Sequence, residues 1–208
     1  MGLATKLRSG LVAKPFIFRS LRAMRMHQPC PESIVPPLSV PDRPLRIAFL
    51  GECMIELSDL AASDGRVAMG VAGDTLNGAI YLSRCLSGTS HSVDYLTALG
   101  TDQLSDRMIA FMEGEGVGAG HIVRRTDRLP GIYAIELDEA GERSFRYWRS
   151  QSAARTMLDE GGLTDDAFQA FDVLVLSAIT LAILSQGARH RLVHARRAKE
   201  GAAQPLRC

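Results

Sequence analysis

The sequence contains few cysteines, and none of them forms a pattern typical of a metal or redox site. Four cysteines stand among 208 residues, at positions 30, 53, 85 and 208, and no two are spaced as C-x-x-C. Neither a disulfide framework nor a zinc ligand set is indicated. Such cysteine usage is typical of a reducing compartment, so we expect a cytoplasmic protein in which Cys53 and Cys85 are small core residues.

Long apolar runs and a strong net charge are also missing. The longest apolar stretch, "VLVLSAITLAIL" (173–184), is too short to cross a bilayer, so no membrane partner is expected. The formal net charge is +1, but residues 1–44 hold seven basic and two acidic residues, which leaves 17 basic and 21 acidic residues in the remainder. A mildly acidic globular part does not favour nucleic acid as a partner.

The N-terminal segment differs from the rest of the chain. Six prolines lie within residues 29–44, and so dense a run is incompatible with regular secondary structure. We therefore predict that residues 1–44 form a disordered, basic and proline-rich extension. Two origins are compatible with this composition: a basic amphipathic targeting helix, or upstream sequence translated from a start codon set too early.

Strand-like and helix-like segments alternate from residue 45 onward. Buried strands are predicted within residues 45–52, 92–102 and 171–177, and amphipathic helices over 102–117 and 185–201. This alternation predicts an α/β fold with a mostly parallel sheet flanked by helices.

An antiparallel hairpin interrupts this alternation. The segment "GIYAIELDEAGERSFRYWR" (131–149) contains two alternating runs joined across "DEAGE", a composition typical of strand, turn and strand.

The segment "VAGDTLNGA" (71–79) places glycine and polar residues at the start of an apolar helix. Glycine permits close approach of a ligand to the backbone, and the free N–H groups of a helix start favour ligand oxygens. Asp74 can accept hydrogen bonds from hydroxyl groups, and Asn77 can both donate and accept them. Alternatively, Asp74 or Thr75 simply caps the helix.

The hairpin offers a second set of candidate residues. Tyr133 lies on one strand, and Tyr147 and Arg149 share a face of the other. A guanidinium can bind a carboxylate through two parallel hydrogen bonds, so this set suits a polyhydroxy carboxylate. Ordinary cross-strand aromatic pairing in an exposed hairpin is the alternative interpretation.

Two further patterns are not interpreted as sites. "GEGVGAG" (114–120) follows a predicted helix and lacks the glycine spacing of a dinucleotide fingerprint, so it indicates a helix C-cap and loop. His190 and His194 have a spacing that can bind metal, but arginines surround them and a solvated basic face is expected.

These segments together resemble the ribokinase-like (PfkB) sugar kinases, in particular those that act on 2-dehydro-3-deoxygluconate. The resemblance runs from about residue 46 to about residue 199 and is carried by "GECMIEL", "GDTLN", "YLTALGTD", "RLPGIYAIELDEAGERSFRYWR" and "LSAITLAILS". It implies a ribokinase-like fold and ATP-dependent, magnesium-dependent phosphorylation of 2-dehydro-3-deoxy-D-gluconate. The hairpin would belong to a lid that closes over the substrate and joins a homodimer. The residues implied to contact the sugar acid are Gly73, Asp74, Asn77, Tyr133, Tyr147 and Arg149.

The family also carries a D-T-x-x-A/G-G-D motif that this sequence does not contain. In that motif, glycine-rich backbone stabilises the phosphates and the aspartate deprotonates the attacking hydroxyl. Residues 45–208 are therefore expected to be the N-terminal part of a sugar kinase domain, truncated at the C-terminus. The catalytic base and the sites for ATP and magnesium would lie outside it, and the chain alone would be inactive. The alternative is a non-catalytic fragment that binds a sugar acid or dimerises.

Overall fold

A computed structural model describes residues 43–60, 65–138 and 140–202, and the fold is stated for these residues. The predicted extension lies outside them except for its last two residues. One of these, Arg43, forms an ion pair with Asp172 at 2.6 Å. The Arg46 backbone N–H also donates to Asp172, at 2.9 Å, so this aspartate fixes the start of the first strand.

A parallel three-stranded sheet forms the centre of the described chain. Strand β1 (Arg46–Leu50) lies between β4 (Ser92–Leu96) and β9 (Val173–Leu176) and pairs in parallel with both. A second parallel pair is formed by β5 (Ala98–Gly100) and β6 (Val123–Arg125).

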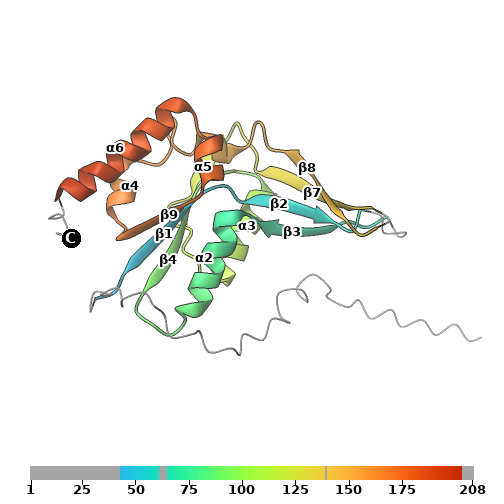
Figure 1. The fold of residues 1–208 in the computed structure, drawn as a ribbon, viewed down its shortest axis with the longest axis horizontal. Coiled ribbons are helices and arrows are strands. Elements are labelled where there is room, and N and C mark those ends of the chain that lie inside the picture. Colours follow the sequence, from blue (N-terminus) through green and yellow to red (C-terminus); the bar gives the residue numbers. More distant parts are fainter. Residues whose placement is uncertain (1–42, 61–64, 139, 203–208) are drawn as a thin grey trace, which may run out of the picture. The chain divides into compact units, whose positions relative to one another are not determined.

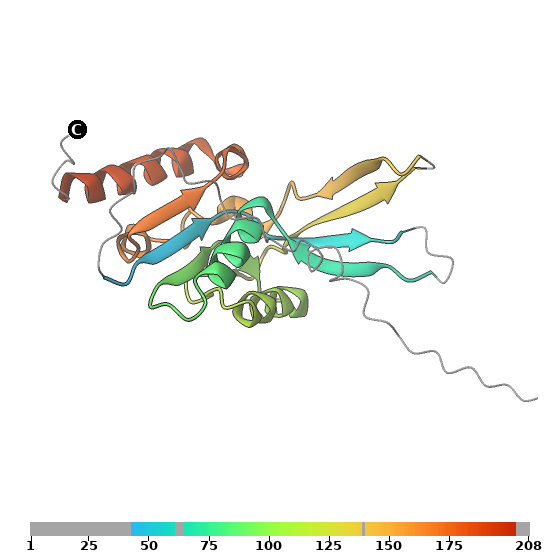
Figure 2. The ribbon, with the colours of Figure 1, turned by 60° about the horizontal axis from the view of Figure 1, so that its bottom comes forward.

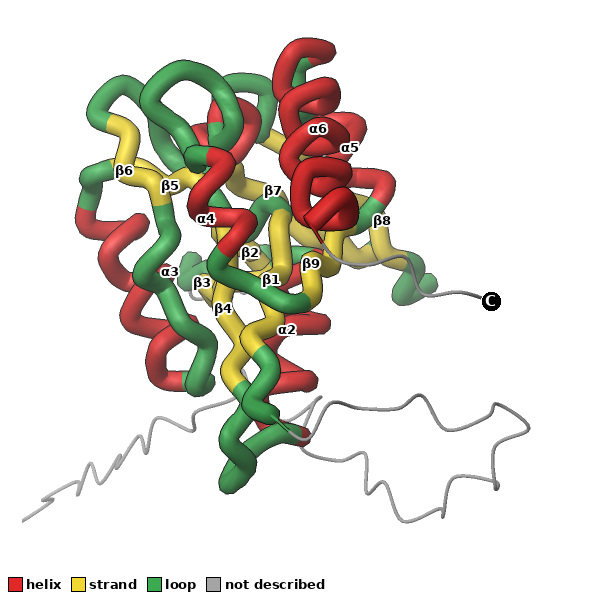
Figure 3. The backbone as a smooth tube through the Cα atoms, turned by 90° about the vertical axis from the view of Figure 1, so that its left-hand side faces the viewer, coloured by secondary structure: helices red, strands yellow, loops and turns green. Residues whose placement is uncertain are grey.

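Helices cover both faces of the central sheet, which confirms the predicted α/β class (Figures 1 and 2). Phe49 on β1 packs into a core with α2 (Asp74–Cys85) and α3 (Gln103–Gly114). The neighbouring Leu50 points to the opposite face, because side chains alternate along a strand. That second core is formed with η1 (Ala153–Thr156), α4 (Asp165–Gln169), α5 (Ala178–Ile183) and α6 (Gln186–Ala202). Figure 3 shows α6 and α2 on opposite sides of β1 and β9.

A second sheet, here called the lid sheet, extends away from these layers. Its order is β3 (Ala68–Ala72), β2 (Met54–Ser58), β7 (Gly131–Leu137) and β8 (Arg143–Trp148). The predicted hairpin is confirmed as β7–β8, but β2 pairs in parallel with β7, so the lid sheet is larger and more mixed than the sequence indicated. Between β1 and β2 the chain passes from one sheet to the other, and residues 51–53 form that junction.

Two expectations about buried residues are wrong. Cys53 is buried as predicted, but Cys85 is exposed, because it lies at the end of α2 and off the buried stripe of Leu76, Ala79 and Ile80. The strand expected within residues 171–177 is only partly buried, with Val173 40% exposed. Within the described sheet β9 stands at the edge, so only one side of it is covered by a neighbouring strand.

The patterns set aside as structural behave as expected. Helix α3 ends at Gly114, and Gly116 adopts a positive φ of 74°, a conformation that glycine accommodates and that is frequent just after helices. His190 and His194 are exposed on α6. No helix in the described part of the chain is long and apolar enough to cross a membrane.

Asp102 caps α3, and replacing it with alanine should lower the free energy of unfolding by about 1 kcal/mol at neutral pH. Its carboxylate accepts hydrogen bonds from the N–H groups of Leu104 and Ser105, both at 3.0 Å, and from the Ser105 hydroxyl at 2.6 Å. Burial alone would raise the pKa of Asp102, but these hydrogen bonds outweigh it and lower the pKa.

The depressed pKa fixes the sign of the pH dependence. The stabilisation from Asp102 is present above its unfolded-state pKa and is lost as the pH falls through the lower folded-state pKa. Urea unfolding of wild type and Asp102→Ala should therefore differ at pH 7 and converge in acid. Asp127→Ala, which removes an exposed carboxylate, is the control. A difference that stays constant into acid would refute the capping role.

Candidate functional site

One cavity brings together all six residues singled out in the sequence. It has a volume of about 190 Å³, below the range of about 300–1,000 Å³ that is typical for drug-sized ligands, so it suits a small molecule. It lies where the junction 51–53, the start of α2, the lid sheet and α5 meet. Its lining residues are Glu52, Met54, Gly73, Asp74, Asn77, Tyr133, Phe145, Tyr147, Arg149, Ile179, Thr180 and Ile183.

The start of α2 supplies the polar floor of the cavity. Asp74 and Asn77 are exposed and lie three residues apart, so they occupy neighbouring positions on one face of the helix. Gly73 precedes them and is buried. A Cβ at this position would come within 2.5 Å of the Glu52 carbonyl oxygen and 3.2 Å of the Cys53 Cα. Glycine is therefore needed here because the junction backbone packs directly against the helix start.

The alternative that these residues only cap the helix accounts for part of the arrangement. Gly73 is the N-cap and offers no side chain, while the Asp74 carboxylate accepts the Thr75 N–H at 2.7 Å. Thr75 is buried, and its hydroxyl pairs with the buried Tyr95 hydroxyl at 2.8 Å, so Thr75 does not cap. Asp74 thus satisfies one backbone donor, while Asn77 makes no contact that a cap would require and remains at the cavity surface.

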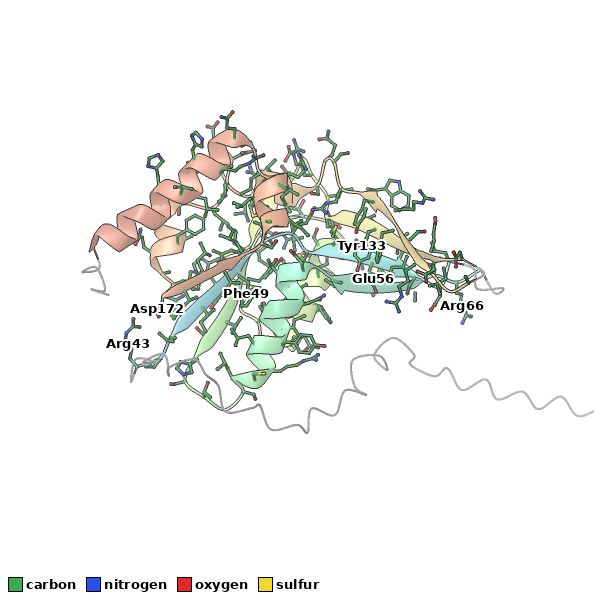
Figure 4. All side chains as sticks on the ribbon, viewed as in Figure 1. Arg43, Phe49, Glu56, Arg66, Tyr133 and Asp172 are labelled. Carbon is green, nitrogen blue, oxygen red and sulfur yellow. The ribbon has the colours of Figure 1, made fainter. Side chains whose placement is uncertain are left out.

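The lid sheet supplies an aromatic wall. Tyr133 on β7 lies directly opposite Tyr147 on β8, with ring centroids 5.8 Å apart, and Phe145 completes the cluster at 6.2 and 6.3 Å from these rings. Tyr133 is nearly buried, whereas Tyr147 is half exposed. The Tyr133 hydroxyl donates to the Glu56 carboxylate on β2, and both side chains are labelled in Figure 4.

This hydrogen bond changes what Tyr133 can do. Burial, followed by the bond to Glu56, raises the pKa of Tyr133, so the hydroxyl stays protonated. Because its proton is directed at Glu56, the hydroxyl can offer a ligand only its lone pairs, while its ring forms part of the wall.

Arg149 follows β8 and lines the cavity, where it is paired with a buried acid. Its Nη2 forms an ion pair with Oε2 of Glu52, whose side chain is 2% exposed against 22% for Arg149. Both contacting atoms are buried and have no hydrogen-bond partner outside the pair. The buried Ser152 hydroxyl donates to the other carboxylate oxygen, Oε1. Glu52 therefore ties the junction between the sheets to the segment that follows the hairpin.

Burial has the largest effect on the pKa of Glu52. It raises the pKa of this carboxyl above its ordinary value, although Ser152, Arg149 and Arg155 each act to lower it. Gly131 leaves the room that the pair occupies, because a Cβ there would lie 2.9 Å from Oε1 of Glu52 and 3.1 Å from Cβ of Arg149. The cavity wall thus holds a carboxylate with little access to water.

Glu52 is the functional candidate that sequence reasoning missed. The segment "GECMIEL" carried the family resemblance, but nothing in its local pattern distinguishes a buried acid from a solvated one. A signal was present, since an acid directly after a buried apolar strand and a glycine is placed at a sheet end. Thr180 and Phe145 were also missed, as were the apolar residues Met54, Ile179 and Ile183.

The cavity combines hydroxyl-binding groups with a single cation. Asp74 and Asn77 can hydrogen-bond to hydroxyl groups, the tyrosine rings can cover the apolar edges of a ligand, and Arg149 can bind a carboxylate. Within the described residues no cluster of three or more histidine, cysteine or acidic side chains could hold a metal ion.

Comparison with known proteins identifies the family to which the chain belongs. The model of the pfkB family carbohydrate kinases matches residues 45–202, and the chain belongs to this family. Among curated proteins it is similar to the 2-dehydro-3-deoxygluconokinase of Dickeya dadantii, with 46% identity over 154 residues, or 73% of this chain and 49% of that protein. The 2-dehydro-3-deoxygluconokinase of Escherichia coli K12 is 43% identical over 71% of this chain and 48% of its own length. The chain thus spans about half the length of the curated relatives it matches.

Solved structures agree on the fold. The chain is similar to the 2-dehydro-3-deoxygluconokinase of Thermotoga maritima, with a TM-score of 0.64 and 20% identity over 77% of this chain and 49% of that one. It is also similar to a fructokinase with bound ATP from Xylella fastidiosa, with a TM-score of 0.59 and 21% identity over 74% and 45% of the two chains. At these identities the similarity establishes the ribokinase-like fold alone.

Proposed function

We propose that residues 45–202 form the sugar half of an ATP-dependent 2-dehydro-3-deoxygluconate kinase, and that the cavity binds the sugar acid. The observation that carries this proposal is the convergence of Arg149, Asp74 and Asn77 on one small cavity. The curated relatives that the chain matches at 43–46% identity are named 2-dehydro-3-deoxygluconokinases, which supports the same substrate class.

The proposed ligand has chemistry that matches the two sides of the cavity. 2-Dehydro-3-deoxygluconate carries a carboxylate at one end and hydroxyl groups at the other. The guanidinium of Arg149 binds the carboxylate, and charge-assisted bonds of this kind are about twice as strong as neutral ones. Asp74 and Asn77 bind hydroxyl groups at the helix start, and Gly73 keeps this floor close to the junction backbone. Tyr133 and Tyr147 cover the ligand from the lid sheet.

The residues that line this cavity do not suit a nucleoside triphosphate. A triphosphate is held by several cations or by a run of free backbone N–H groups. Here the lining supplies one guanidinium, which is already paired with Glu52, together with the acids Glu52 and Asp74. The cavity therefore suits the sugar acid and not the triphosphate of ATP.

We further propose that the whole protein is a cytoplasmic homodimer that associates through the lid sheet. The large exposed side chains of Leu137 and Trp148, which are 63% and 61% exposed on the lid sheet, support the dimer. The cysteine usage supports the cytoplasmic location.

The test is calorimetric titration of the 208-residue chain with two ligands. One is 2-dehydro-3-deoxygluconate, and the other is 3-deoxyfructose, which has a hydroxymethyl group in place of the carboxylate. At a pH low enough to protonate Glu52, we expect the acid to bind at least about tenfold more tightly, the low end of the value of a charge-assisted bond. Equal affinities at that pH, or no binding of either ligand, would refute the proposal.

A further inference from the structure

Glu52 presents a difficulty for any acid that binds in this cavity. The lining contains two carboxylates, Glu52 and Asp74, and one guanidinium, Arg149. The guanidinium already contacts Glu52, so an incoming carboxylate would be a second anion on the same cation. Asp74 is exposed and screened by water, whereas the Glu52 side chain is 2% exposed and is not. The unfavourable charge is therefore that of Glu52.

We propose that Glu52 determines the preference of the cavity for acid or neutral sugars, and that it takes up one proton from solvent when a carboxylate binds at Arg149. This inference rests on the proposed function, because it concerns the same cavity and the same ligand class. The proton adds to the Glu52 carboxylate, which becomes neutral, and the Arg149 charge is then balanced by the ligand. The hydrogen bond from the Ser152 hydroxyl to Oε1 of Glu52 can remain in place.

Glu52 could either repel the ligand carboxylate or hold the Arg149 side chain in place, and the sizes of these two effects on affinity can be compared. Two carboxylates on neighbouring edges of one guanidinium lie about 5 Å apart, and at an effective dielectric constant of about 20 their repulsion weakens binding by about two orders of magnitude. If Glu52 only held Arg149 in place, the gain from ordering one long side chain would be about tenfold or less. Repulsion is the larger effect, so an ionised Glu52 opposes acid binding overall.

The surroundings of Glu52 favour its protonation, because a buried carboxylate cannot be screened by water from the charge of the ligand. Burial already raises its pKa in the free chain, and a second anion raises it further. Within the described chain, the charged and titratable groups around it are Arg149 after β8, Arg155 in η1, Asp74 at the start of α2, the adjacent Cys53, Tyr95 on β4 and Tyr133 on β7. Burial raises the pKa of Cys53 to about 12 and raises the pKa of Tyr95 and Tyr133, so none of these three groups titrates near neutral pH.

The sign of the pH dependence follows from this linkage. The pKa of Glu52 is higher in the complex than in the free chain, so the affinity for the acid falls as the pH rises between these two values. In that window the slope approaches tenfold per pH unit for one proton. A neutral sugar brings no second anion, so its affinity should not change with pH for this reason.

The experiment is calorimetry of the wild-type chain in two buffers of different ionisation enthalpy, which counts the protons taken up. With 2-dehydro-3-deoxygluconate we expect uptake approaching one proton at pH values between the pKa of Glu52 in the free chain and its higher pKa in the complex, and with 3-deoxyfructose none. This count needs no variant, so it does not depend on whether a substituted chain folds.

Glu52→Gln gives the matching test by substitution, because it removes the charge and keeps the shape. We expect acid affinity at about pH 8 to rise by about 10- to 100-fold, its pH dependence to flatten, and affinity for the neutral sugar to stay nearly constant. Glu136→Gln is the matched control, since it alters an exposed glutamate–arginine pair on the same hairpin outside the cavity.

The outcomes separate this inference from the proposed function. Acid binding that depends on Arg149 but takes up no proton, or that weakens in Glu52→Gln, would overturn the inference and leave the proposed function intact. Acid binding that does not depend on Arg149 at all would overturn both.

Discussion

Arg149→Ala should weaken binding of 2-dehydro-3-deoxygluconate by about 10- to 150-fold. The substitution removes a charge-assisted contact worth roughly 1.5–3 kcal/mol, and each 1.4 kcal/mol is about tenfold in affinity. Arg149→Lys should recover only part of the loss, because an ammonium group cannot reproduce the planar two-point contact. Isothermal titration with each variant measures the effect, and Arg146→Ala on the outer side of β8 is the control.

Arg149→Ala should also lower the stability of the fold, because it breaks the ion pair with Glu52, and this loss must be distinguished from the loss of affinity. Removing one partner of a buried pair typically costs 3–5 kcal/mol of stability. Arg149 is 22% exposed and Glu52 can take up a proton, so we expect about 3 kcal/mol or less. Repeating Arg149→Ala in the Glu52→Gln background should reduce the stability loss and preserve the affinity loss. If the affinity loss disappears in that background, Arg149 supports the fold and does not bind the ligand.

Gly73→Ala should lower the free energy of unfolding by about 1–3 kcal/mol, the usual cost of overpacking a well-packed site. The reason is steric, because the backbone of Gly73 is extended and any residue could adopt it. The new methyl group would lie 2.5 Å from the Glu52 carbonyl oxygen, which belongs to the junction backbone and cannot rotate away. Helix α2 and the junction must move apart, so sugar-acid affinity should fall together with stability.

Urea unfolding monitored by circular dichroism measures the effect, and Gly120→Ala is the matched control. A Cβ at Gly120 would meet no atom within 4 Å, so this substitution should change stability by no more than about 0.5 kcal/mol. Equal stability of the two variants would mean that the close approach at Gly73 is not a constraint.

Local sequence pattern predicted the cavity's polar and aromatic sides because each is encoded within one segment. Asp74 and Asn77 are brought together by helical spacing, and Tyr133 and Tyr147 by the register of a single hairpin. Their convergence depends on the lid sheet, in which the ends of β3 and β8 lie beside the starts of β2 and β7, and the pattern of one segment does not encode this pairing.

The features that were missed depend on contacts between distant segments. Glu52 is buried because β2 leaves the central sheet and pairs with β7, and no pattern near residue 52 encodes that choice. The partial exposure of β9 depends on which strands flank it, while its apolar composition alone suggested burial on both faces. Cys85 is different: the helical stripe of Leu76, Ala79 and Ile80 predicts its exposure, and cysteine's general preference for burial gave the wrong answer.

A crystal structure of the chain with bound 2-dehydro-3-deoxygluconate would show whether this cavity is the sugar-acid site. We expect the ligand in the cavity between the start of α2 and the lid sheet, with its carboxylate on Arg149 and its hydroxyl groups on Asp74 and Asn77. The Glu52 side chain should lie next to the ligand carboxylate. A ligand bound elsewhere, or one whose carboxylate points away from Arg149, would show that this cavity does not bind the sugar acid as proposed.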